Sequence, residues 1–559
     1  MPAGTARSRP AAIRLPLAAV AFVALADTAI VALALPPILR ELNTDVAGVA
    51  AVLGIYAVVL ALALLPAEWF ARTSGTRTLG LAGVALFGGG SLACGLAGDL
   101  GLLLAARAVQ ATGGAALLVT AHAALVGDGA EAAGLRLWRL AALLGTAAGP
   151  AIGGALTQAF GWRSIFLLQA PLALAAVPGC RSAPPVRITP RARQAARGLV
   201  YFAALALVSG AIAAALFLTV LLLISGWGIE PFAAALVVSV MPLSALTATR
   251  IRGRPGERAA AGALLVAAGA AALAFLPTAS VAWTILPQLT VGVGMGLAFA
   301  AFAGELLPDR DGLESARLLT MRHAGIALAL LILAPIAQHE LDTTLHDTRL
   351  RGAALILDAR IDPQLKLEIA PRLNQSVETE DPRGGLERVF ADARGAVEQD
   401  QLAAYDELTN RADELLVSSV NEAFRTAFLV ASGLALLAAG MLAAAGVRPA
   451  PRPRMLGAVT VGAVIAVGAF ALLADSARPA PVELANPCEA RDLPGTGGIT
   501  GFAQDAALAA ADVVACRVGS TREELVLALA DDQAARDYER RYGVNPRSAL
   551  DIAKQFLPR

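Results

Sequence analysis

Most of the chain is a succession of apolar runs of about 20 residues, separated by short segments that carry the charged side chains. A membrane-spanning helix needs about 20 apolar residues, so the pattern predicts thirteen spans. The predicted spans are residues 13–37, 46–66, 79–98, 100–126, 135–160, 164–179, 199–224, 231–249, 259–276, 281–307, 318–337, 424–446 and 455–474. We therefore expect an all-α polytopic membrane protein.

Two long segments are too polar to span a membrane. Residues 338–423 carry 18 acidic and 9 basic side chains, and the tail begins after Ala474. Apolar residues in the first segment recur at mostly helical spacing, which predicts an amphipathic helix leading into span 424–446. In the tail, Ser520-Thr521-Arg522-Glu523 resembles a capping box that opens a helix, and Pro546 is expected to open another. Both segments are interpreted as small helical units.

The arginines predict the orientation, because basic short loops stay on the cytoplasmic side. With the N-terminus inside, the inner segments hold 21 arginines and the short outer loops hold only Arg40 and Arg163. This places 338–423 and the C-terminal tail outside the cytoplasm. Cleavage of the first run as a signal peptide, at Ala32-Leu33-Ala34, is disfavoured because the run is long, contains Asp27 and precedes further spans.

Composition supports the membrane assignment and excludes several classes. The chain is 57% hydrophobic and 16% charged, whereas soluble domains carry about 25% charged residues. Its net charge of +1 gives no basic face for nucleic acid. Lys366 and Lys554 are the only lysines and neither follows a glycine, which rules out a phosphate-binding loop and an ATP-driven pump. We expect no enzyme activity and no cofactor.

Cysteine and histidine positions suggest one disulfide and no metal site. Cys488 and Cys516 both lie in the tail, where a bridge would add about 3 kcal/mol of stability to a small unit. The alternative is two unpaired thiols. His339 and His346 match no metal-ligand spacing, so they are interpreted as solvated surface residues.

Four short motifs resemble those of drug:proton antiporters in the major facilitator superfamily. The stretch 27–36, DTAIVALALP, is similar to the first-helix signature D-x-T-I-V-N-V-A-L-P, and 107–115, RAVQATGGA, to R-x-x-Q-G-x-G-x-A. The stretch 145–154, GTAAGPAIGG, matches the antiporter motif G-x-x-x-G-P-x-x-G-G in full, and GWRSIF at 161–166 follows it. The resemblance implies two six-helix halves that enclose a substrate cavity.

Two departures from the family pattern are visible. The loop between the second and third spans carries Arg72 where the superfamily has the Asp that helps to close the cytoplasmic gate. Only 18 residues, 180–197, separate the halves, which leaves no room for the two extra helices of the fourteen-helix branch. We therefore divide the chain as follows: N-terminal half 13–179, basic linker 180–197, C-terminal half 198–337 with 424–446, acidic insertion 338–423, loop and thirteenth span 447–474, and tail 475–559.

Asp27 and Arg107 are the candidate proton-coupling residues. A charged carboxylate at mid-span costs at least ~2.5 kcal/mol, so Asp27 should face the bundle interior. Burial favours its neutral form and a nearby cation favours its charged form, a balance that suits proton exchange. The resemblance supplies Arg107 as that cation. The alternative is a static structural ion pair.

The antiporter motif predicts a bare helix face and a bend. Gly145, Gly149 and Gly153 recur every four residues and form one strip that a neighbouring backbone can approach closely, and Gly154 follows. Pro150 removes a backbone donor inside the same helix. The resemblance implies that this helix seals the cavity and favours export, whereas the spacing alone predicts tight packing.

Three further polar residues are candidates for lining a substrate cavity. Gln110 shares a helix face with Arg107. Arg322 and His323 resemble the family's R-Q-x-G, with His323 in place of the glutamine, although interfacial anchoring is an equal alternative.

The resemblance implies a proton-coupled exporter of lipophilic or amphipathic compounds in a bacterial plasma membrane. Its partners would be the lipid bilayer, protons and a small substrate. The alternative is a degenerate permease that acts as an envelope scaffold or sensor and presents its outer segments to a partner. Loss of the gate Asp and about 170 residues outside the membrane favour this second interpretation.

Overall fold

A computed structural model describes residues 11–126, 132–186, 197–248, 250–303, 305–307, 312–377, 382–446 and 454–548. Helices form almost all of the regular structure in these ranges. The first half holds α1 (Ala11–Ala32), α2 (Leu35–Glu41), α3 (Val46–Ser74), α4 (Thr76–Gly95), α5 (Leu100–Val126), α6 (Ala132–Phe160), α7 (Arg163–Ala175) and α8 (Val177–Arg181). The second half holds α9 (Arg197–Leu221) with a π-helical end (Leu222–Gly226), α10 (Pro231–Val238), α11 (Val240–Ala248), α12 (Pro255–Leu273), α13 (Val281–Phe302), α14 (Gly312–Asp358) and α17 (Leu402–Gly446).

The remaining helices lie outside this twelve-span core. They are α15 (Pro363–Val377), α16 (Pro382–Ala393), a 3-10 turn (Arg394–Ala396), α18 (Arg454–Ser476), α19 (Gly498–Val518), α20 (Arg522–Ala530) and α21 (Asp532–Tyr542). Thirteen helices in the described ranges are long and apolar enough to cross a membrane. Twelve of them match predicted spans, and α6 covers the remaining prediction, 135–160. The predicted all-α polytopic fold is confirmed.

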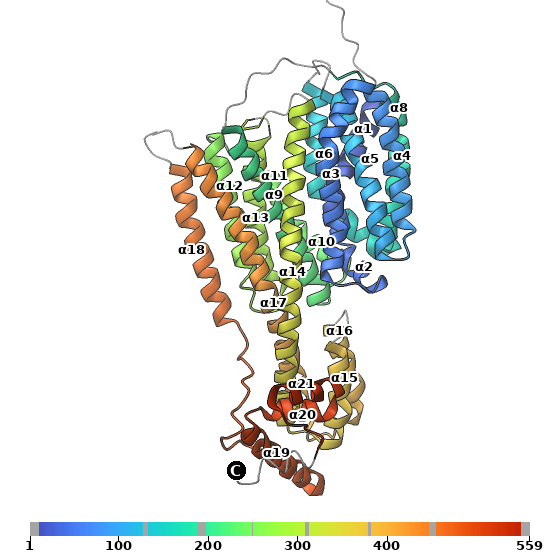
Figure 1. The fold of residues 1–559 in the computed structure, drawn as a ribbon. Coiled ribbons are helices and arrows are strands. Elements are labelled where there is room, and N and C mark those ends of the chain that lie inside the picture. The colour runs from blue at the N-terminus through green and yellow to red at the C-terminus, as the bar shows by residue number, and fades with distance from the viewer. Residues whose placement is uncertain are drawn as a thin grey trace, which may run out of the picture.

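Helix α19 also meets the length and hydropathy criteria for a span, but it lies outside the bundle. It sits at the end of the molecule farthest from the transmembrane helices (Figure 1) and is mostly exposed. Length and composition therefore cannot distinguish it from a span, and only its position in the fold does.

Two helices run far beyond the bundle. The 47-residue α14 passes through it and continues to Asp358, and the 45-residue α17 begins outside and returns through it. At 1.5 Å per residue α14 is about 70 Å long, more than twice a hydrocarbon core of about 30 Å. The ends of the predicted insertion, 338–358 and 402–423, are thus continuations of spans. We call these extensions with α15 and α16 the stalk, and the end of the bundle that carries it the stalk face (Figure 1).

The stalk is bonded to the bundle and to itself. Trp227 at the end of the π-helical turn donates its ring N–H to Asn421 Oδ1 on α17, at 2.9 Å. Arg383 of α16 pairs with Asp413 at 2.7 Å and donates to the Trp227 carbonyl at 3.1 Å. Farther out, the Tyr405 hydroxyl donates to the Phe390 carbonyl at 2.6 Å. These contacts hold the stalk in one position relative to the membrane helices.

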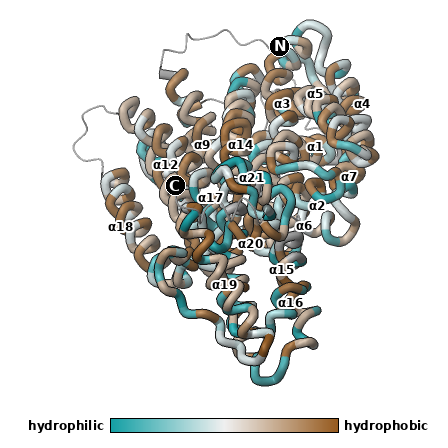
Figure 2. The backbone as a smooth tube through the Cα atoms, turned by 60° about the horizontal axis from the view of Figure 1, so that its bottom comes forward, coloured by the Kyte–Doolittle hydropathy of each residue, from teal (hydrophilic) through white to brown (hydrophobic). Residues whose placement is uncertain are grey.

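The thirteenth span lies at the side of the bundle. Helix α18 packs on α12 and is otherwise largely exposed (Figure 1). Hydrophobic residues occur along the whole of α18, whereas α21 is mainly hydrophilic (Figure 2). At the stalk face, Phe470 of α18 makes an edge-to-face contact with Trp283 of α13, with ring centroids 5.6 Å apart. Because α18 ends at the stalk face, it delivers the tail to the same side as the stalk.

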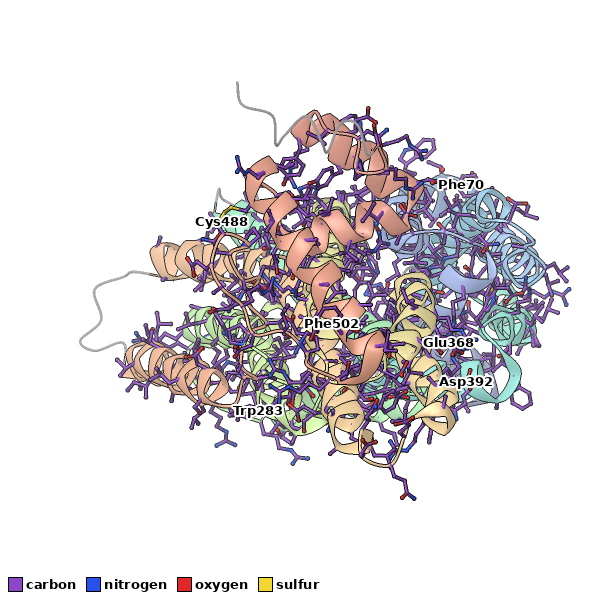
Figure 3. The ribbon with its side chains drawn as sticks, turned by 90° about the horizontal axis from the view of Figure 1, so that it is seen from below. Phe70, Trp283, Glu368, Asp392, Cys488 and Phe502 are labelled. Carbon is purple, nitrogen blue, oxygen red and sulfur yellow. A yellow bond between two sulfur atoms is a disulfide. The ribbon has the colours of Figure 1, made fainter. Side chains whose placement is uncertain are left out.

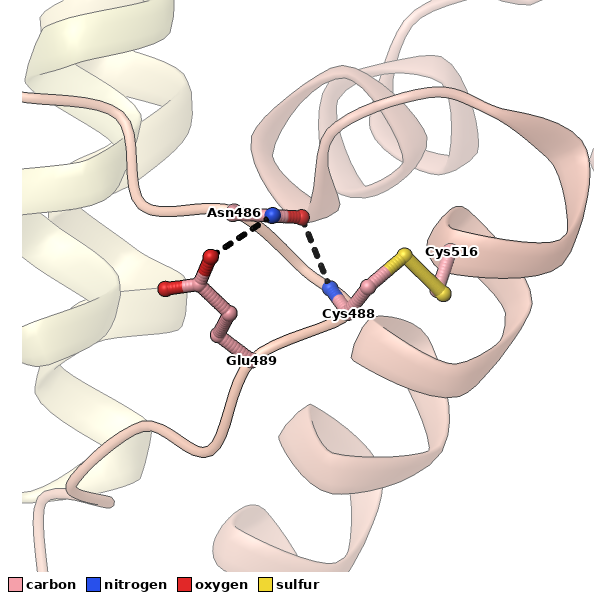
Figure 4. Close-up of a disulfide and its surroundings, with 4 residues drawn as sticks. All are labelled: Asn486, Cys488, Glu489 and Cys516. Atoms are coloured by element: carbon pink, nitrogen blue, oxygen red, sulfur yellow. Dashed lines mark hydrogen bonds between the residues drawn. A yellow bond between two sulfur atoms is a disulfide. The ribbon is translucent and has the colours of Figure 1, made fainter.

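The tail forms a small module of α19, α20 and α21, which crosses the stalk when viewed along the bundle (Figure 3). The capping box lies one residue later than predicted. The Thr521 side chain caps α20, and the Glu524 side chain accepts a hydrogen bond from the Thr521 backbone N–H. A disulfide joins Cys488, in the segment between α18 and α19, to Cys516 in α19 (Figure 4). The two cysteines are 28 residues apart in the sequence. The helix expected after Pro546 lies mostly outside the described residues.

A buried ion network attaches the tail module to the end of α14. Arg522, which is fully buried, contacts Asp358 at 2.5 Å and Glu523 at 3.4 Å. Arg491, in the segment between α18 and α19, also contacts Asp358 and Glu523, each at 3.1 Å. Burial raises the pKa of neighbouring Asp512, and Arg522 and Arg491 oppose that shift. Two cations therefore share the carboxylates of the stalk and the tail.

We expect Arg522→Gln to release the tail from the stalk. The change leaves Glu523 buried with one cation fewer, and breaking a buried ion pair costs about 3–5 kcal/mol. Limited proteolysis should then cut the segment between α18 and α19, near Cys488, faster than in the wild type. Arg540→Gln is the matched control, because Arg540 is exposed and pairs with Asp537 on its own helix. Equal cleavage of both variants would contradict the docking role.

Candidate transport site

An ion pair lies fully buried at mid-span in the N-terminal six-helix half of the protein. It joins Asp27 of α1 to Arg107 of α5, and both side chains are 0% exposed. The guanidinium meets the carboxylate through two bonds, Nη1 to Oδ1 at 2.9 Å and Nη2 to Oδ2 at 2.5 Å. Such a fork-to-fork arrangement is both directional and strong. The structure thus brings together the two residues that the sequence motifs singled out.

Three more polar side chains complete a network around the pair. Gln110, one turn after Arg107, accepts from Arg107 Nη1 at 2.7 Å. Its amide nitrogen donates to Ser91 Oγ and to Gln169 Oε1, both at 2.8 Å. The Gln169 amide in turn donates to Asp27 Oδ1 at 3.4 Å. We expected Gln110 to line a cavity, and it lies instead inside the first half.

Gln169 and Ser91 were not among the site residues predicted from the sequence. Gln169 is the one strongly polar side chain between Arg163 and Arg181, within an apolar run, and it is 3% exposed. An isolated polar residue in a membrane span was the available signal, because such residues face the bundle interior.

Arg107 has further partners that do not depend on Asp27. Its Nε donates to the Val52 carbonyl on α3 at 3.2 Å. Its Cζ lies 4.3 Å from the centroid of the Tyr56 ring and 5.5 Å from that of Phe166. A cation over an aromatic face is stabilised by the ring quadrupole, more so where water is excluded. The guanidinium is therefore held from α3, α5 and α7 as well as from α1.

A small cavity separates this network from the second half. It measures about 50 Å³ and is lined by Thr28, the residue after Asp27, and by Ser209, Arg322 and His323 among apolar neighbours. The His323 ring nitrogen Nδ1 lies 2.8 Å from the Leu319 carbonyl. Arg322 Cζ lies 5.7 Å from the Phe299 ring centroid. Arg322 and His323 thus face the first half across the centre of the bundle.

The two halves are in contact along α3 and α14. At the stalk face, the Val46 N–H on α3 donates to Gln338 Oε1 on α14 at 3.1 Å. Farther along the same two helices, near Arg322 and His323, the Thr320 hydroxyl on α14 donates to the Ala61 carbonyl on α3 at 3.3 Å. The central cavity, at about 50 Å³, is too small for a drug-sized molecule, whose pockets measure about 300 Å³ or more.

Glu68 lies one turn before Arg72, the residue that stands in the position of the family Asp. It is 1% exposed and accepts two bonds from Arg72, at 3.1 and 2.9 Å. A Cβ added to Gly312, the first residue of α14, would lie 2.7 Å from Glu68 Oε1. A carboxylate is stabilised at a helix N-terminus by the free backbone N–H groups and the dipole. The loss of the family Asp at Arg72 was visible in the sequence. Glu68, one turn earlier, was not predicted as part of the gate.

The antiporter motif lies directly against α1. A Cβ at Gly145 would come within 3.0 Å of the Phe22 carbonyl oxygen, and one at Gly153 within 2.2 Å of the Ile30 carbonyl oxygen. Gly149 lies between them, and a Cβ added there would come within 2.9 Å of Ala29 Cβ. Gly154 faces the second half, where an added Cβ would lie 2.3 Å from Ala235 Cβ of α10. Thus α6, with Pro150 inside it, packs against the helix that carries Asp27 and against the opposite half.

The fold and the buried site define a polytopic bundle of two halves around a central polar cavity, the architecture of a secondary transporter. The sequence profile of the Major Facilitator Superfamily matches residues 17–337. The chain belongs to this superfamily, as its motifs predicted. It is accordingly a member of a transporter family and not of an enzyme family.

The related proteins include resistance proteins. The chain is 37% identical over 155 residues to the multidrug resistance protein Stp of Mycobacterium tuberculosis, a match covering 27% of this chain and 29% of Stp. It is 33% identical over 179 residues to the tetracenomycin C resistance and export protein of Streptomyces glaucescens, covering 32% of this chain and 33% of that protein. These matches therefore span about a third of each relative.

The likeness to solved structures concerns the fold. A bacterial homolog of the human lysosomal transporter Spinster, in an inward-facing and unoccupied conformation, superposes with a TM-score of 0.52 at 16% identity. The match covers 79% of this chain and all of that one.

We expect Gly153→Ala to disrupt the contact between α6 and α1. The added methyl group would collide with backbone, which cannot move away as a flexible side chain can, and overpacking typically costs about 1–3 kcal/mol. Gly89→Ala on α4 is the matched control, since nothing lies within 4 Å of its added Cβ. Thermal unfolding in detergent should show a lower midpoint for Gly153→Ala alone. A midpoint unchanged from the wild type would show that α6 does not pack as described.

Proposed function

We propose that the chain exports lipophilic or amphipathic compounds in exchange for protons, with Asp27 as the proton carrier and Arg107 as its counterion. The observation that carries the proposal is the fully buried Asp27–Arg107 pair, one residue from the cavity between the halves. An ionisable residue inside a membrane span is expensive and marks a functional pathway by default.

The surroundings of Arg107 support proton exchange over a static pair. When Asp27 takes up a proton, the guanidinium loses its counterion and must remain buried. The Gln110 Oε1 atom, the Val52 carbonyl and the Tyr56 ring are contacts that would persist. They lower the cost of the unpaired state, so that Asp27 can release Arg107 without Arg107 leaving the membrane interior.

The substrate class rests on the cavity and on the relatives. The central cavity has apolar walls with Thr28, Ser209, Arg322 and His323 as its polar groups, which suits amphipathic compounds once the halves separate. One relative is named for resistance to and export of tetracenomycin C. Alternating access follows if the contacts at the two faces open in turn.

The orientation belongs to the same proposal. We infer that the stalk face is extracytoplasmic and the opposite face cytoplasmic, in a bacterial plasma membrane. The arginine distribution supports this, and so does the tail disulfide, because disulfides persist in oxidising compartments. Antiport of one proton for an uncharged compound then gains about 2.3 kcal/mol per 100 mV.

We expect Asp27→Asn to abolish proton-driven transport in proteoliposomes. With one proton exchanged for an uncharged substrate, a potential of 100 mV sustains a gradient of about 50-fold, and the variant should fall to about onefold. Asp45→Asn is the control, because Asp45 is a cap outside the bundle and Asn caps a helix equally well. A static pair predicts a different result: lower thermal stability of Asp27→Asn with the gradient intact.

We expect Glu68→Gln to loosen the contact at the cytoplasmic face. Loss of the charge removes the attraction to the first turn of α14 and the ion pair with Arg72. Thr320→Cys should then react severalfold faster with a maleimide than it does in the Glu68 background. Glu257→Gln serves as control, because Glu257 is a partly exposed acid in the first turn of α12. Unchanged labelling would mean that Glu68 does not hold the gate.

The scaffold interpretation keeps one observation in its favour. Helix α19 exposes Ile499 and Phe502 at 89% and 76%, at the far end of the tail module. Exposed apolar clusters of this kind mark interaction sites. A protein that sustains no substrate gradient in proteoliposomes, yet binds an envelope partner through α19, would establish the scaffold role.

A further inference from the structure

A second cavity lies at the stalk face, outside the transport pathway. It measures about 440 Å³ and is bounded by the end of α12, the outer part of α17 and the segment 475–482 that follows α18. Leu276 and Pro277 form part of its wall on the bundle side, and Pro479 and Pro481 part of its outer wall. Its volume is in the range of small-molecule sites, about 300–1,000 Å³.

Three half-buried arginines line this cavity. Arg351 comes from α14, and Arg411 and Arg425 come from α17. Within the described part of the chain, no ion pair or hydrogen bond joins any of the three to another residue. Arg425 is oriented by an aromatic ring, with its Cζ 5.0 Å from the Phe275 centroid. Partly buried cations without a counterion favour an anionic ligand.

The acidic residues of the cavity do not satisfy these arginines. Glu414, Glu422 and Asp475 also line it, but all three are exposed. The ion pair of Asp475 is with Arg478, at 3.4 Å, on the outer wall. The positive groups therefore lie deeper than the negative ones, which favours an anionic group that enters the cavity.

One face of α17 connects the cations with the membrane. Arg411, Leu415, Ser418, Glu422 and Arg425 follow each other at spacings of three or four residues and so share one side of the helix. The 14 residues from Arg411 to Arg425 rise about 21 Å. The cavity thus reaches from the stalk down to the end of the bundle.

The lower end of this cavity lies at the level of lipid head groups. The Trp283–Phe470 pair stands at the stalk-face ends of α13 and α18, and aromatic side chains gather at the membrane–water interface. Helix α18 ends at Ser476, at the cavity wall. Because α18 packs on the bundle through α12 and is otherwise exposed, lipids of this leaflet surround it.

We propose that this cavity binds the head group of an anionic phospholipid from the leaflet at the stalk face, with Arg425 holding the phosphate. Planar guanidinium groups bind phosphate oxygens through paired hydrogen bonds. The chemistry shared with a free phosphate ion is the phosphate group itself, and the position at the lipid interface favours the lipid. The site is independent of the proton-coupled transport proposed above.

Native mass spectrometry of the detergent-purified full chain tests the proposal. We expect phosphatidylglycerol to bind tighter than phosphatidylcholine, and Arg425→Gln to weaken phosphatidylglycerol binding by about tenfold. Arg425→Lys keeps the charge and loses the planar fork, so it should recover only part of the affinity. Arg372→Gln is the matched control, since Arg372 is exposed on α15 and pairs with Glu368 on its own helix at 3.4 Å.

The outcomes separate the sources of the anion. Equal affinity for the two lipids, or variants that bind phosphatidylglycerol like the wild type, would overturn the proposal. Competition by inorganic phosphate at the same concentration as the lipid would identify a site for soluble anions and equally overturn it. Arg425→Lys guards against a folding artefact, because a variant that keeps the charge and the unfolding midpoint still has to lose affinity.

Discussion

The protein is organised around a pair of opposite charges kept away from water inside the membrane. Asp27 and Arg107 are each fully buried, and neither could stay there alone, because one unpaired charge in such a place costs several kcal/mol. Helices α1 and α5 must therefore keep their relative height, and the glycine strip of α6 packs α1 from the other side. Gln110 and Gln169 use the remaining hydrogen-bonding capacity of the pair. The packing of the first half follows from satisfying these groups.

The contacts between the halves use a different principle. Around the centre, Arg322 and His323 face Thr28 across a small cavity, while single hydrogen bonds join α3 to α14 at the stalk face and farther along the same two helices. At the first residue of α14, Gly312 lies against the Glu68 carboxylate of α3. Each of these contacts is a single polar interaction or a charge at a helix terminus, so each is weak compared with the doubly hydrogen-bonded pair inside the first half.

The motif residues that surround Asp27 could be named from the sequence because each carries a chemical signal within an apolar run. Gln169 carried the same signal but no motif, and Glu68 was obscured by the unusual Arg72 beside it. The continuous α14 was not predicted as one helix, since the change from apolar to acidic residues after 337 marks the end of the membrane and not the end of the helix. Helix α19 shows the converse, an apolar helix that lies outside the bundle.

The sequence by itself determined where the spans lie and in what order, because a strongly apolar run of about 20 residues favours a helix that crosses the bilayer. It also determined that Asp27 and Arg107 are buried, since charge inside a span must face other protein. Only the tertiary structure decided which polar groups meet. Arg107 with Asp27, Glu68 with the start of α14, and Arg522 with Asp358 are contacts between residues 80, 244 and 164 positions apart. Hydropathy describes each apolar run separately. Which residues of different runs come into contact is decided only when the helices pack.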